Sequence, residues 1–416
     1  MADETVQDII VIGAGIIGIS SALALQATGR QVLVLDRQAE TARASEMNAG
    51  AFAFTDIVPL ATPGIMRKAP KWLLDPLGPL SVPPAYALKI APWMLRFWRA
   101  SWPDRYQASM SAQAALMKLA QDALARQVSD TGAASLIQAE GQLQLYEGEA
   151  EFRASLPGWE LRKQHDIRFE LLESPEAIAA IQPGLDRRFT HAAFTPDWTN
   201  TCDPARWLAH LTSVFLQRGG RIESADVSGL KPSEDSVQIE ASDKAGMAKQ
   251  VVVAAGAWSH RLAKTIGDRI PLETERGYNT TLPEGSFDLK THLTFSGHGF
   301  VVTKINGGVR VGGAVELGGL TLPPNFKRAD ILLDKARRFL PALKTDGGKK
   351  WMGFRPSMPD SLPVIDRSPG DHRVVYAFGH GHLGLTQSAG TAELVANLVS
   401  DTQNPVDMAA FSARRF

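Results

Sequence analysis

Residues 9–20 read IIVIGAGIIGIS, an apolar run that meets three closely spaced glycines and then continues with small and apolar residues at helical spacing. This pattern predicts a buried strand, a tight turn and a helix. A second apolar run, QVLVLD at residues 31–36, predicts a second buried parallel strand. The sequence therefore predicts one βαβ unit, which begins close to its first residue.

The three glycines of this unit, Gly13, Gly15 and Gly18, have the Gly-x-Gly-x-x-Gly spacing of a dinucleotide-binding turn. The first permits a sharp turn, the second lets a diphosphate approach the backbone, and the third lets helix and strand pack closely. Free amides at the helix N-terminus favour the phosphate charge. We therefore expect a dinucleotide here, contacted also by Ala14, Ile16 and Ile17.

A carboxylate, Asp36, ends the second predicted strand. At that place a carboxylate accepts hydrogen bonds from a ribose 2′-hydroxyl and would repel a 2′-phosphate. Two alternatives to a redox cofactor site stay open at this point. One is a glycine turn of purely structural use, and the other is an NAD-binding sensor or structural subunit that performs no redox chemistry.

The rest of the chain alternates between helical and strand patterns. Helices are predicted at 105–127, after Asp203 and Pro204, and at 326–340, and strands separated by loops are predicted at 141–195. Residues 270–315 predict an antiparallel sheet. The run KQVVVAAGAWS and the final stretch RVVYAFGHGHLGLTQSAG each predict a buried strand that ends in glycine.

The composition is that of a soluble globular chain. The 416 residues are 44% hydrophobic and 21% charged, and 44 basic residues balance 44 acidic ones, so no electrostatic footprint for nucleic acid is expected. The single cysteine, Cys202, allows no internal disulfide and no cysteine-based metal site. Because the acidic start MADETVQD is unlike an export signal, we expect a cytoplasmic protein.

Several segments resemble the flavoproteins related to D-amino-acid oxidase, the DAO family. These are the opening βαβ unit, the strand VVVAAGAWS at 251–259, the C-terminal glycine turn and the run LDRQAETARASEMNAG at 35–50, which is similar to bacterial FAD-dependent D-amino-acid dehydrogenases. The resemblance covers most of the chain and implies FAD. It implies cofactor contacts at Arg37, Gln38, Ser45, Asn48, Ala49, Gly50, Ala255, Gly256 and Trp258.

The resemblance also implies that the FAD is bound noncovalently. Related sarcosine oxidases attach their flavin to a cysteine at a place that matches Met352 or Gly353 here, and Cys202 lies far along the chain from that place.

The C-terminal turn, FGHGHLGLTQSAG at 378–390, faces the flavin pyrimidine in the resembling enzymes. A helix N-terminus there would stabilise negative charge on the reduced flavin. The histidine pair in this turn could also suggest a metal, but no third ligand is apparent in the sequence nearby, so no metal is expected. The implied cofactor residues are Gly379, His380, Gly381, His382, Leu383, Gly384, Leu385 and Thr386.

A substrate anchor is implied by GFRP at 353–356, which resembles a family segment whose arginine grips the substrate carboxylate. Arginine suits this role because its planar fork makes two charge-assisted bonds. We therefore expect Arg355 in that role. Tyr278, in RGYN, is either a substrate-pocket residue or a cross-strand packing residue. Where related amine oxidases place a further tyrosine, this chain has Phe300, so His298 or Tyr278 is expected to fill the missing role.

The fold implied by these readings is α/β, with an FAD-binding Rossmann-like domain of the glutathione-reductase type and an interleaved α+β substrate domain on a mixed, largely antiparallel sheet. We expect the FAD-binding domain at 1–70, 200–262 and 350–416, and the substrate-binding domain at 71–199 and 263–349.

The reaction implied by the resemblance is oxidation of a D-amino acid, with hydride passing from Cα to flavin N5 and the imine hydrolysing to a 2-oxo acid. Alternatives are a D-proline or D-hydroxyproline dehydrogenase, which would leave a cyclic imine, and a glycine or sarcosine oxidase that uses oxygen. For the electrons, the expected acceptor is a quinone or another respiratory carrier.

Residues 70–102 are rich in tryptophan, proline and leucine, with interspersed lysine and arginine. The stretch at 85–102 predicts an amphipathic helix interrupted near Pro92. Two interpretations stay open: the segment packs on its own domain, or it makes a peripheral contact with the inner face of the membrane.

Overall fold

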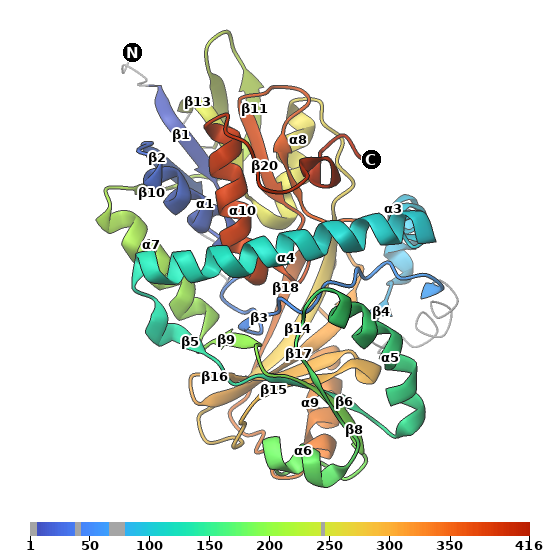
Figure 1. The fold of residues 1–416 in the computed structure, drawn as a ribbon. Helices are drawn as coiled ribbons and strands as arrows, with labels where there is room; N and C mark the ends of the chain where they lie inside the picture. Colours follow the sequence, from blue (N-terminus) through green and yellow to red (C-terminus); the bar gives the residue numbers. More distant parts are fainter. Residues whose placement is uncertain (1–5, 38–42, 66–79, 243–245) are drawn as a thin grey trace.

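Two β-sheets joined by long helices form the computed structural model of the protein, which describes residues 6–37, 43–65, 80–242 and 246–416 (Figure 1). The first sheet has eight strands in the order β10-β2-β1-β13-β12-β11, with β20 beside β13 and β19 beside β20. These strands are β1 (Gln7–Ile12), β2 (Val32–Asp36), β10 (Arg221–Ser224), β11 (Val227–Pro232), β12 (Val237–Ala241), β13 (Gly246–Val253), β19 (Val364–Arg367) and β20 (Val374–Phe378).

The centre of this sheet is parallel and buried on both faces. Strands β10, β2, β1, β13 and β20 run in one direction. Along β1, Ile9 and Val11 pack into one apolar cluster and Ile10 and Ile12 into another, because successive side chains of a strand point to opposite faces. The continuous apolar run of the sequence thus fills two cores at once, as expected for a covered parallel strand.

Helices cover one face of the first sheet. Helices α1 (Ile16–Ala27), α7 (Pro204–Gln217) and α10 (Gly384–Val399) share one apolar cluster with the sheet, and α4 (Pro103–Thr131) runs across α10 (Figure 1). A Cβ at Gly390 would lie 2.9 Å from the Cα of Ala120, so α4 and α10 touch backbone to backbone. On the other face lie the short helix α8 (Ser259–Thr265) and the β11–β12 hairpin.

The second sheet has nine strands in the order β18-β14-β17-β16-β15-β6-β8-β7, with β4 beside β17. It is mixed: β6 pairs with β15, and β4 with β17, in parallel, while the other pairs are antiparallel. Its strands are β4 (Leu80–Ser81), β6 (Gln142–Tyr146), β7 (Glu170–Leu172), β8 (His191–Thr195), β14 (Glu273–Leu282), β15 (His292–Phe295), β16 (Phe300–Ile305), β17 (Gly308–Glu316) and β18 (Lys349–Ser357).

One helix and a small third sheet complete the frame. Helix α9 (Lys327–Phe339) buries Leu332, Ala336 and Phe339 in the apolar cluster of the second sheet. The third sheet has the strand order β3-β9-β5, formed by β3 (Ala51–Phe52), β9 (Thr199–Thr201) and β5 (Ile137–Gln138). The α/β class with a second, largely antiparallel sheet is thus confirmed.

Three details differ from the expectation. Helices α5 (Glu149–Gln164) and α6 (Pro175–Ile181) lie in the segment where only strands and loops were predicted. Pro157 sits inside α5 and obscures its helical pattern, while buried Phe152 and Trp159 hold the helix in place. Helix α3 (Ala87–Ala100) continues through Pro92 without interruption.

The third difference concerns β18. The expected boundary assigned residues from 350 onward to the FAD-binding domain, whereas β18 is a strand of the second sheet. It is an edge strand of that sheet. Pro356 has no backbone N–H to donate, which an edge strand tolerates. The strand that carries Arg355 therefore belongs to the second sheet.

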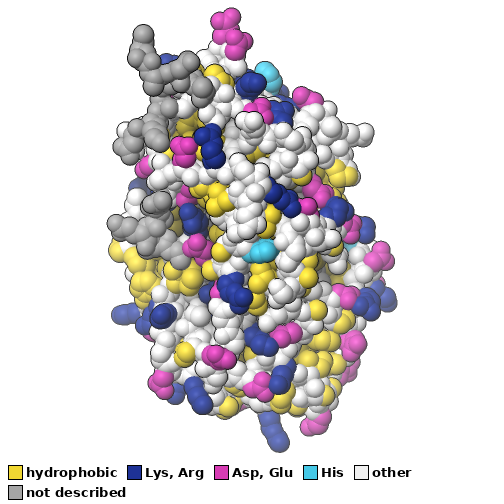
Figure 2. All heavy atoms as spheres, turned by 90° about the vertical axis from the view of Figure 1, so that its left-hand side faces the viewer, with side chains coloured by type: hydrophobic (Ala, Val, Ile, Leu, Met, Phe, Trp, Pro, Cys, Tyr) yellow, Lys and Arg dark blue, Asp and Glu magenta, His cyan; other side chains and the backbone are white. Residues whose placement is uncertain are grey.

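Charge is evenly spread over the molecular face drawn in Figure 2. Basic and acidic side chains are interspersed there among apolar and uncharged ones. This pattern agrees with the equal numbers of basic and acidic residues in the sequence. Among the described residues, no helix is both long and apolar enough to cross a membrane.

Candidate active site

One cavity of about 990 Å³ runs between the two sheets. Its floor is formed by the residues that follow the carboxyl ends of β1, β2, β13 and β20, where open parallel sheets bind their ligands. Most of the expected cofactor residues line it. They are Gly13, Gly15, Ile16, Ile17, Asp36, Arg37, Ser45, Asn48, Ala49, Ala255, Gly256, Trp258, His380, Gly381, His382, Leu383, Gly384, Leu385 and Thr386.

The first glycine turn has no room for side chains. Gly13 has a φ of +110°, and a Cβ there would lie 2.4 Å from the carbonyl oxygen of Ala254. A Cβ at Gly18 would lie 1.8 Å from the carbonyl oxygen of Gly13. At Gly15 the nearest atom to an added Cβ is the hydroxyl oxygen of Ser45 at 3.3 Å, so this glycine faces the cavity. The turn leaves its open side toward a ligand.

Two side chains approach the amides of this turn. The backbone N–H of Ala14 donates to Asp36 at 2.7 Å, and that of Ile16 donates to the Ser45 hydroxyl at 3.0 Å. Arg43 donates to the second oxygen of Asp36 at 2.7 Å. Asp36 therefore lies beside the diphosphate cradle at the end of β2, while Ala14 and Gly18 support the cradle without lining the cavity.

A cation–aromatic pair also lines the cavity. The Arg37 guanidinium lies 3.7 Å from the centre of the Trp258 ring, and both residues line the cavity. A flat side chain and a stacked cation make a surface suited to a purine base. Gln38, the next expected contact, lies outside the described residues.

The segment 45–50 is held over the second sheet by groups that the sequence analysis missed. The Arg310 guanidinium donates to the carbonyl oxygen of Asn48, and Asn279 donates to that of Met47 at 3.0 Å. Arg310 is 5% exposed, and burial lowers its pKa to about 10. Gly50 lies behind the cavity wall with a φ of +79°. The roles of Arg310 and Asn279 could not be predicted from the sequence, because they depend on the pairing of β14 with β17.

Helix α10 points its N-terminus at the cavity. Gly384, Leu385 and Thr386, its first residues, line the wall, and the Thr386 hydroxyl accepts a hydrogen bond from the backbone N–H of Ala53 at 3.0 Å. This hydrogen bond holds the first turn of α10 against Ala53, which follows segment 45–50 in the chain. The free amides and the helix dipole provide a positive end for an electron-rich ring.

The two histidines of the preceding turn have different environments. His380 is buried, its Nε2 lies 3.0 Å from the Thr391 hydroxyl, and burial lowers its pKa to about 3. His382 lines the cavity. Burial lowers its pKa, and the charges of Asp56 and Glu275 oppose that shift. Gly379 supports the turn with a φ of +88° outside the cavity wall.

Arg355 lies on the second sheet with its guanidinium over Gly277. A Cβ at Gly277 would come within 2.2 Å of the Arg355 Nη2, so only glycine leaves room for it. One Nη donates to the carbonyl oxygen of Ala314 at 3.0 Å. Burial lowers the pKa of Arg355, and the carboxylate of Glu275 opposes that shift. Arg355 lines the cavity, where a guanidinium can hold an anion.

The other two expected substrate residues are placed differently. Tyr278 contributes to the wall, but its hydroxyl donates to Glu316 at 2.8 Å and accepts from the backbone N–H of Asn325 at 3.0 Å. His298 lies outside the cavity lining, with its Nε2 2.9 Å from Glu147. Neither position supplies the free polar group that a carboxylate clamp with Arg355 would need.

The residues present fit FAD. The glycine cradle is closed to side chains and open to a ligand, a cation–aromatic pair lines the cavity, and the α10 N-terminus lies along the wall. The carbonyl oxygen of the Asn279 side chain, which lines the same cavity, is buried without a partner. In the described part of the chain, no group of three or more metal-ligating side chains comes together. Cys202 is half-buried and lies outside this cavity.

Known proteins resemble the chain over its whole length. The family model for FAD dependent oxidoreductases, DAO, matches residues 8–398. A D-amino-acid oxidase from Bradyrhizobium diazoefficiens is 34% identical over 98% of both chains. A D-amino acid dehydrogenase from Sinorhizobium medicae is 31% identical over 98% of this chain and 99% of that one.

Solved structures share the fold. A glycine oxidase from Geobacillus kaustophilus has a TM-score of 0.76 at 18% identity and covers 98% of both chains. An L-proline dehydrogenase from P. horikoshii has a TM-score of 0.76 at 17% identity and covers 99% of this chain and 98% of that one. Together with the cavity geometry, these matches show that the chain belongs to the DAO family of FAD-dependent oxidoreductases.

Proposed function

We propose that the protein oxidises D-amino acids at Cα. The observation that carries this proposal is the Arg355 guanidinium, which lies over Gly277, donates to the carbonyl oxygen of Ala314 and lines the cavity. The names of the relatives at 34% and 31% identity support the same substrate class.

FAD, when bound, supplies the two-electron acceptor for the hydride that leaves Cα. The chain itself binds and orients the substrate: Arg355 holds the carboxylate with two parallel charge-assisted bonds and so fixes the direction of the Cα–H bond. The amine reacts in its neutral form, so one proton leaves the ammonium nitrogen before the hydride leaves. The resulting imine takes up water and yields a 2-oxo acid and ammonium.

A panel of amino acids tests this proposal. The purified holoenzyme is mixed anaerobically with D-amino acids, their L-enantiomers, D-proline, D-hydroxyproline, glycine and sarcosine, and the visible absorption band of the flavin is followed. We expect D-amino acids to bleach the band and L-enantiomers to leave it unchanged. Bleaching by glycine or sarcosine alone would contradict the proposal, and bleaching by D-proline alone would assign the cyclic substrate class.

We also propose that the FAD is bound noncovalently. Met352 lines the cavity where a linking cysteine would lie in related enzymes, and Cys202 lies elsewhere. After denaturation the flavin colour should stay in solution and not with the precipitated chain.

The electron acceptor is proposed to be a membrane quinone, which helix α3 would bring close to the site. Its residue Phe97 lines a small side pocket next to His382, whereas its outer face exposes Leu88 (91%), Leu95 (64%) and Trp98 (46%). Exposed Lys89 and Arg96 flank this apolar face, a combination that suits an anionic membrane surface.

Flotation tests the membrane contact. The holoenzyme should float with vesicles that contain anionic lipid, and the double variant Leu88→Asp/Leu95→Asp should stay at the bottom of the gradient. Leu216→Asp is the matched control, because Leu216 is 46% exposed on α7, on another helix. If the wild type fails to float, the membrane contact is wrong. Reduction of a soluble quinone analogue by the reduced enzyme tests the acceptor separately.

The domain division is likewise proposed in the form that the sheets suggest. The first sheet with its helices would be the FAD-binding domain, and the second sheet, including β18, would be the substrate-binding domain.

A further inference from the structure

Glu275 stands directly opposite Arg355 in the ladder between β14 and β18. Directly paired residues of antiparallel strands point to the same face of the sheet. Glu275 and Gly277 therefore share the face on which the Arg355 guanidinium lies, and Arg276 and Tyr278 point to the other face. The carboxylate and the guanidinium are thus neighbours in one wall of the cavity.

The carboxylate of Glu275 accepts no hydrogen bond from the described residues, although the residue is 5% exposed and its charge interacts with Arg355. Two other glutamates in this region, Glu316 and Glu273, do accept hydrogen bonds. Glu316 accepts from Arg276 and Tyr278, and Glu273 accepts from the Tyr86 hydroxyl at 3.0 Å. A buried carboxylate that accepts no hydrogen bond has acceptor capacity left over, so Glu275 can take a further donor from a ligand while Arg355 lies beside it.

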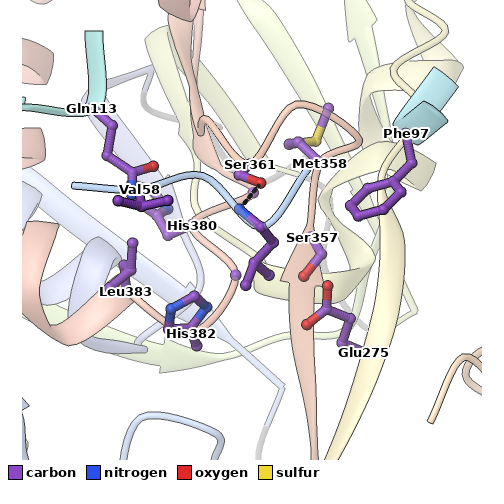
Figure 3. A pocket seen from close by; sticks show the side chains of 13 residues that line it. Val58, Phe97, Gln113, Glu275, Ser357, Met358, Ser361, His380, His382 and Leu383 are labelled. Atoms are coloured by element: carbon purple, nitrogen blue, oxygen red, sulfur yellow. Dashed lines mark hydrogen bonds between the residues drawn. The ribbon is translucent and has the colours of Figure 1, made fainter. Parts of the chain in front are cut away.

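Beyond Glu275 lies the side pocket, which shares Glu275 and His382 with the main cavity. Figure 3 shows the Glu275 carboxylate and the Ser357 hydroxyl facing one another. The side pocket offers about 10 Å³, the room that one water-sized group needs. Its apolar wall is formed by Val58, Leu60, Phe97, Met358 and Leu383.

The side pocket is lined by the polar side chains of Gln113, Glu275, Ser357 and Ser361 and by the imidazoles of His380 and His382, whose pKa values burial lowers. The Ser357 hydroxyl is buried without a partner. The Gln113 side chain donates its Nε2 to the carbonyl oxygen of Asp56 at 2.7 Å, so its remaining atom, an unpartnered Oε1, is an acceptor. A charged carboxylate, a hydroxyl and an amide oxygen within an apolar wall form a site for a compact cation with several N–H donors.

We propose that Glu275, assisted by Ser357, binds a positively charged side-chain group of the substrate, so that the enzyme prefers basic D-amino acids. This inference rests on the proposed function for the D-amino-acid backbone. Arg355 holds the substrate carboxylate, the substrate chain extends past Glu275, and its terminal ammonium enters the side pocket. The same carboxylate disfavours D-aspartate and D-glutamate by like-charge repulsion.

The test uses ligands that lack an α-amino group and therefore cannot be oxidised. 4-Aminobutanoate, 5-aminopentanoate and 6-aminohexanoate are compared with pentanoate, hexanoate and heptanoate, which replace the terminal ammonium by a methyl group. Binding to the holoenzyme is measured by the perturbation of the flavin spectrum. We expect at least one ammonium ligand to bind about tenfold more tightly than its methyl counterpart.

The variant Glu275→Gln should bring this ratio to about one or below. Glu273→Gln is the matched control, since Glu273 lies on the same strand, carries the same group and lies outside both cavity linings. A ratio near one in the wild type would overturn the proposal, whether or not the variant folds. An unchanged ratio in Glu275→Gln would overturn it as well.

Kinetics separate this site from recognition of the α-ammonium group. If Glu275 bound that group instead, Glu275→Gln would lower kcat/KM equally for D-lysine and D-norleucine, and the proposal would be wrong. We expect the variant to lose kcat/KM for D-lysine alone. Failure of every D-amino acid to bleach the flavin would reject the proposed function, while the ligand series would still report on the side pocket.

Discussion

The two ends of the cavity are built in different ways. At the glycine turn the ligand surface is backbone, formed by residues within a few positions of one another between Gly13 and Gly18. At the substrate end the surface consists of side chains from separate strands, with Glu275 on β14, Ala314 on β17 and Arg355 on β18. At the first end Gly13 and Gly18 leave no room for a Cβ, and the second end depends on which charges the strand register brings together.

The largest effect is expected at the backbone end. Gly18→Ala places a Cβ 1.8 Å from the Gly13 carbonyl oxygen, so α1 must move away from the turn. We expect a loss of about 3 kcal/mol or more in unfolding free energy and loss of FAD from the purified chain. The ratio of flavin to protein absorbance and urea unfolding measure both effects.

The control for this variant is Gly246→Ala on β13, where the nearest atom to the added Cβ is 3.8 Å away. If Gly18→Ala keeps its FAD as this control does, the backbone cradle is not the cofactor-binding element.

At the substrate end, Arg355→Met tests the side-chain anchor. Removing two charge-assisted bonds to a carboxylate, worth about 3 kcal/mol together, should raise KM for a D-amino acid about a hundredfold while FAD stays bound. Steady-state kinetics and the flavin content measure this. The exposed Arg337→Met on α9 serves as control. Unchanged KM in Arg355→Met would remove Arg355 from substrate binding.

The buried His380 beneath the cavity predicts a pH dependence. Its pKa is about 3 in the native state against an ordinary 6.5, so below pH 6.5 the unfolded chain takes up a proton that the native state refuses. The unfolding free energy is therefore unaffected by His380 above pH 6.5. Below pH 6.5 it falls by about 1.4 kcal/mol for each pH unit, until the pH approaches 3.

His380→Gln removes this contribution. With free FAD held constant, the loss of unfolding free energy between about pH 7.5 and about pH 5.5 should be smaller in the variant by about 1.4 kcal/mol. The exposed His372→Gln should leave the wild-type pH dependence unchanged. Equal pH dependence in His380→Gln and the wild type would contradict the burial argument.

The smallest effect is expected at Tyr278, whose hydroxyl is already bonded on both sides. Tyr278→Phe leaves Glu316 and the Asn325 amide each one partner short, which should cost about 1–2 kcal/mol of unfolding free energy with little change in KM. Urea unfolding and kinetics together decide. A large rise in KM with unchanged stability would show that the hydroxyl contacts the substrate.

The sequence analysis missed two helices, α5 and α6. Helix α5 contains Pro157 and lies where tertiary contacts of Phe152 and Trp159 decide the conformation. Local patterns identified α7 correctly, because Asp203 caps it through the Ala205 amide and Pro204 is its first residue. Helix α6 departs from this rule: it was missed although Ser174 caps it through the Ala177 amide and Pro175 is its first residue.

By itself, the sequence determined the βαβ unit and its glycine turn with Asp36, because these are encoded by residues adjacent in the chain, and it predicted Arg355 as a cavity residue only through a family resemblance. Only the tertiary structure revealed Arg310, Asn279, the buried Glu275 beside Arg355 and the hydrogen-bonded hydroxyl of Tyr278. The physical reason is register: a ladder places residue 275 opposite residue 355, and no local pattern records which strand will be the neighbour.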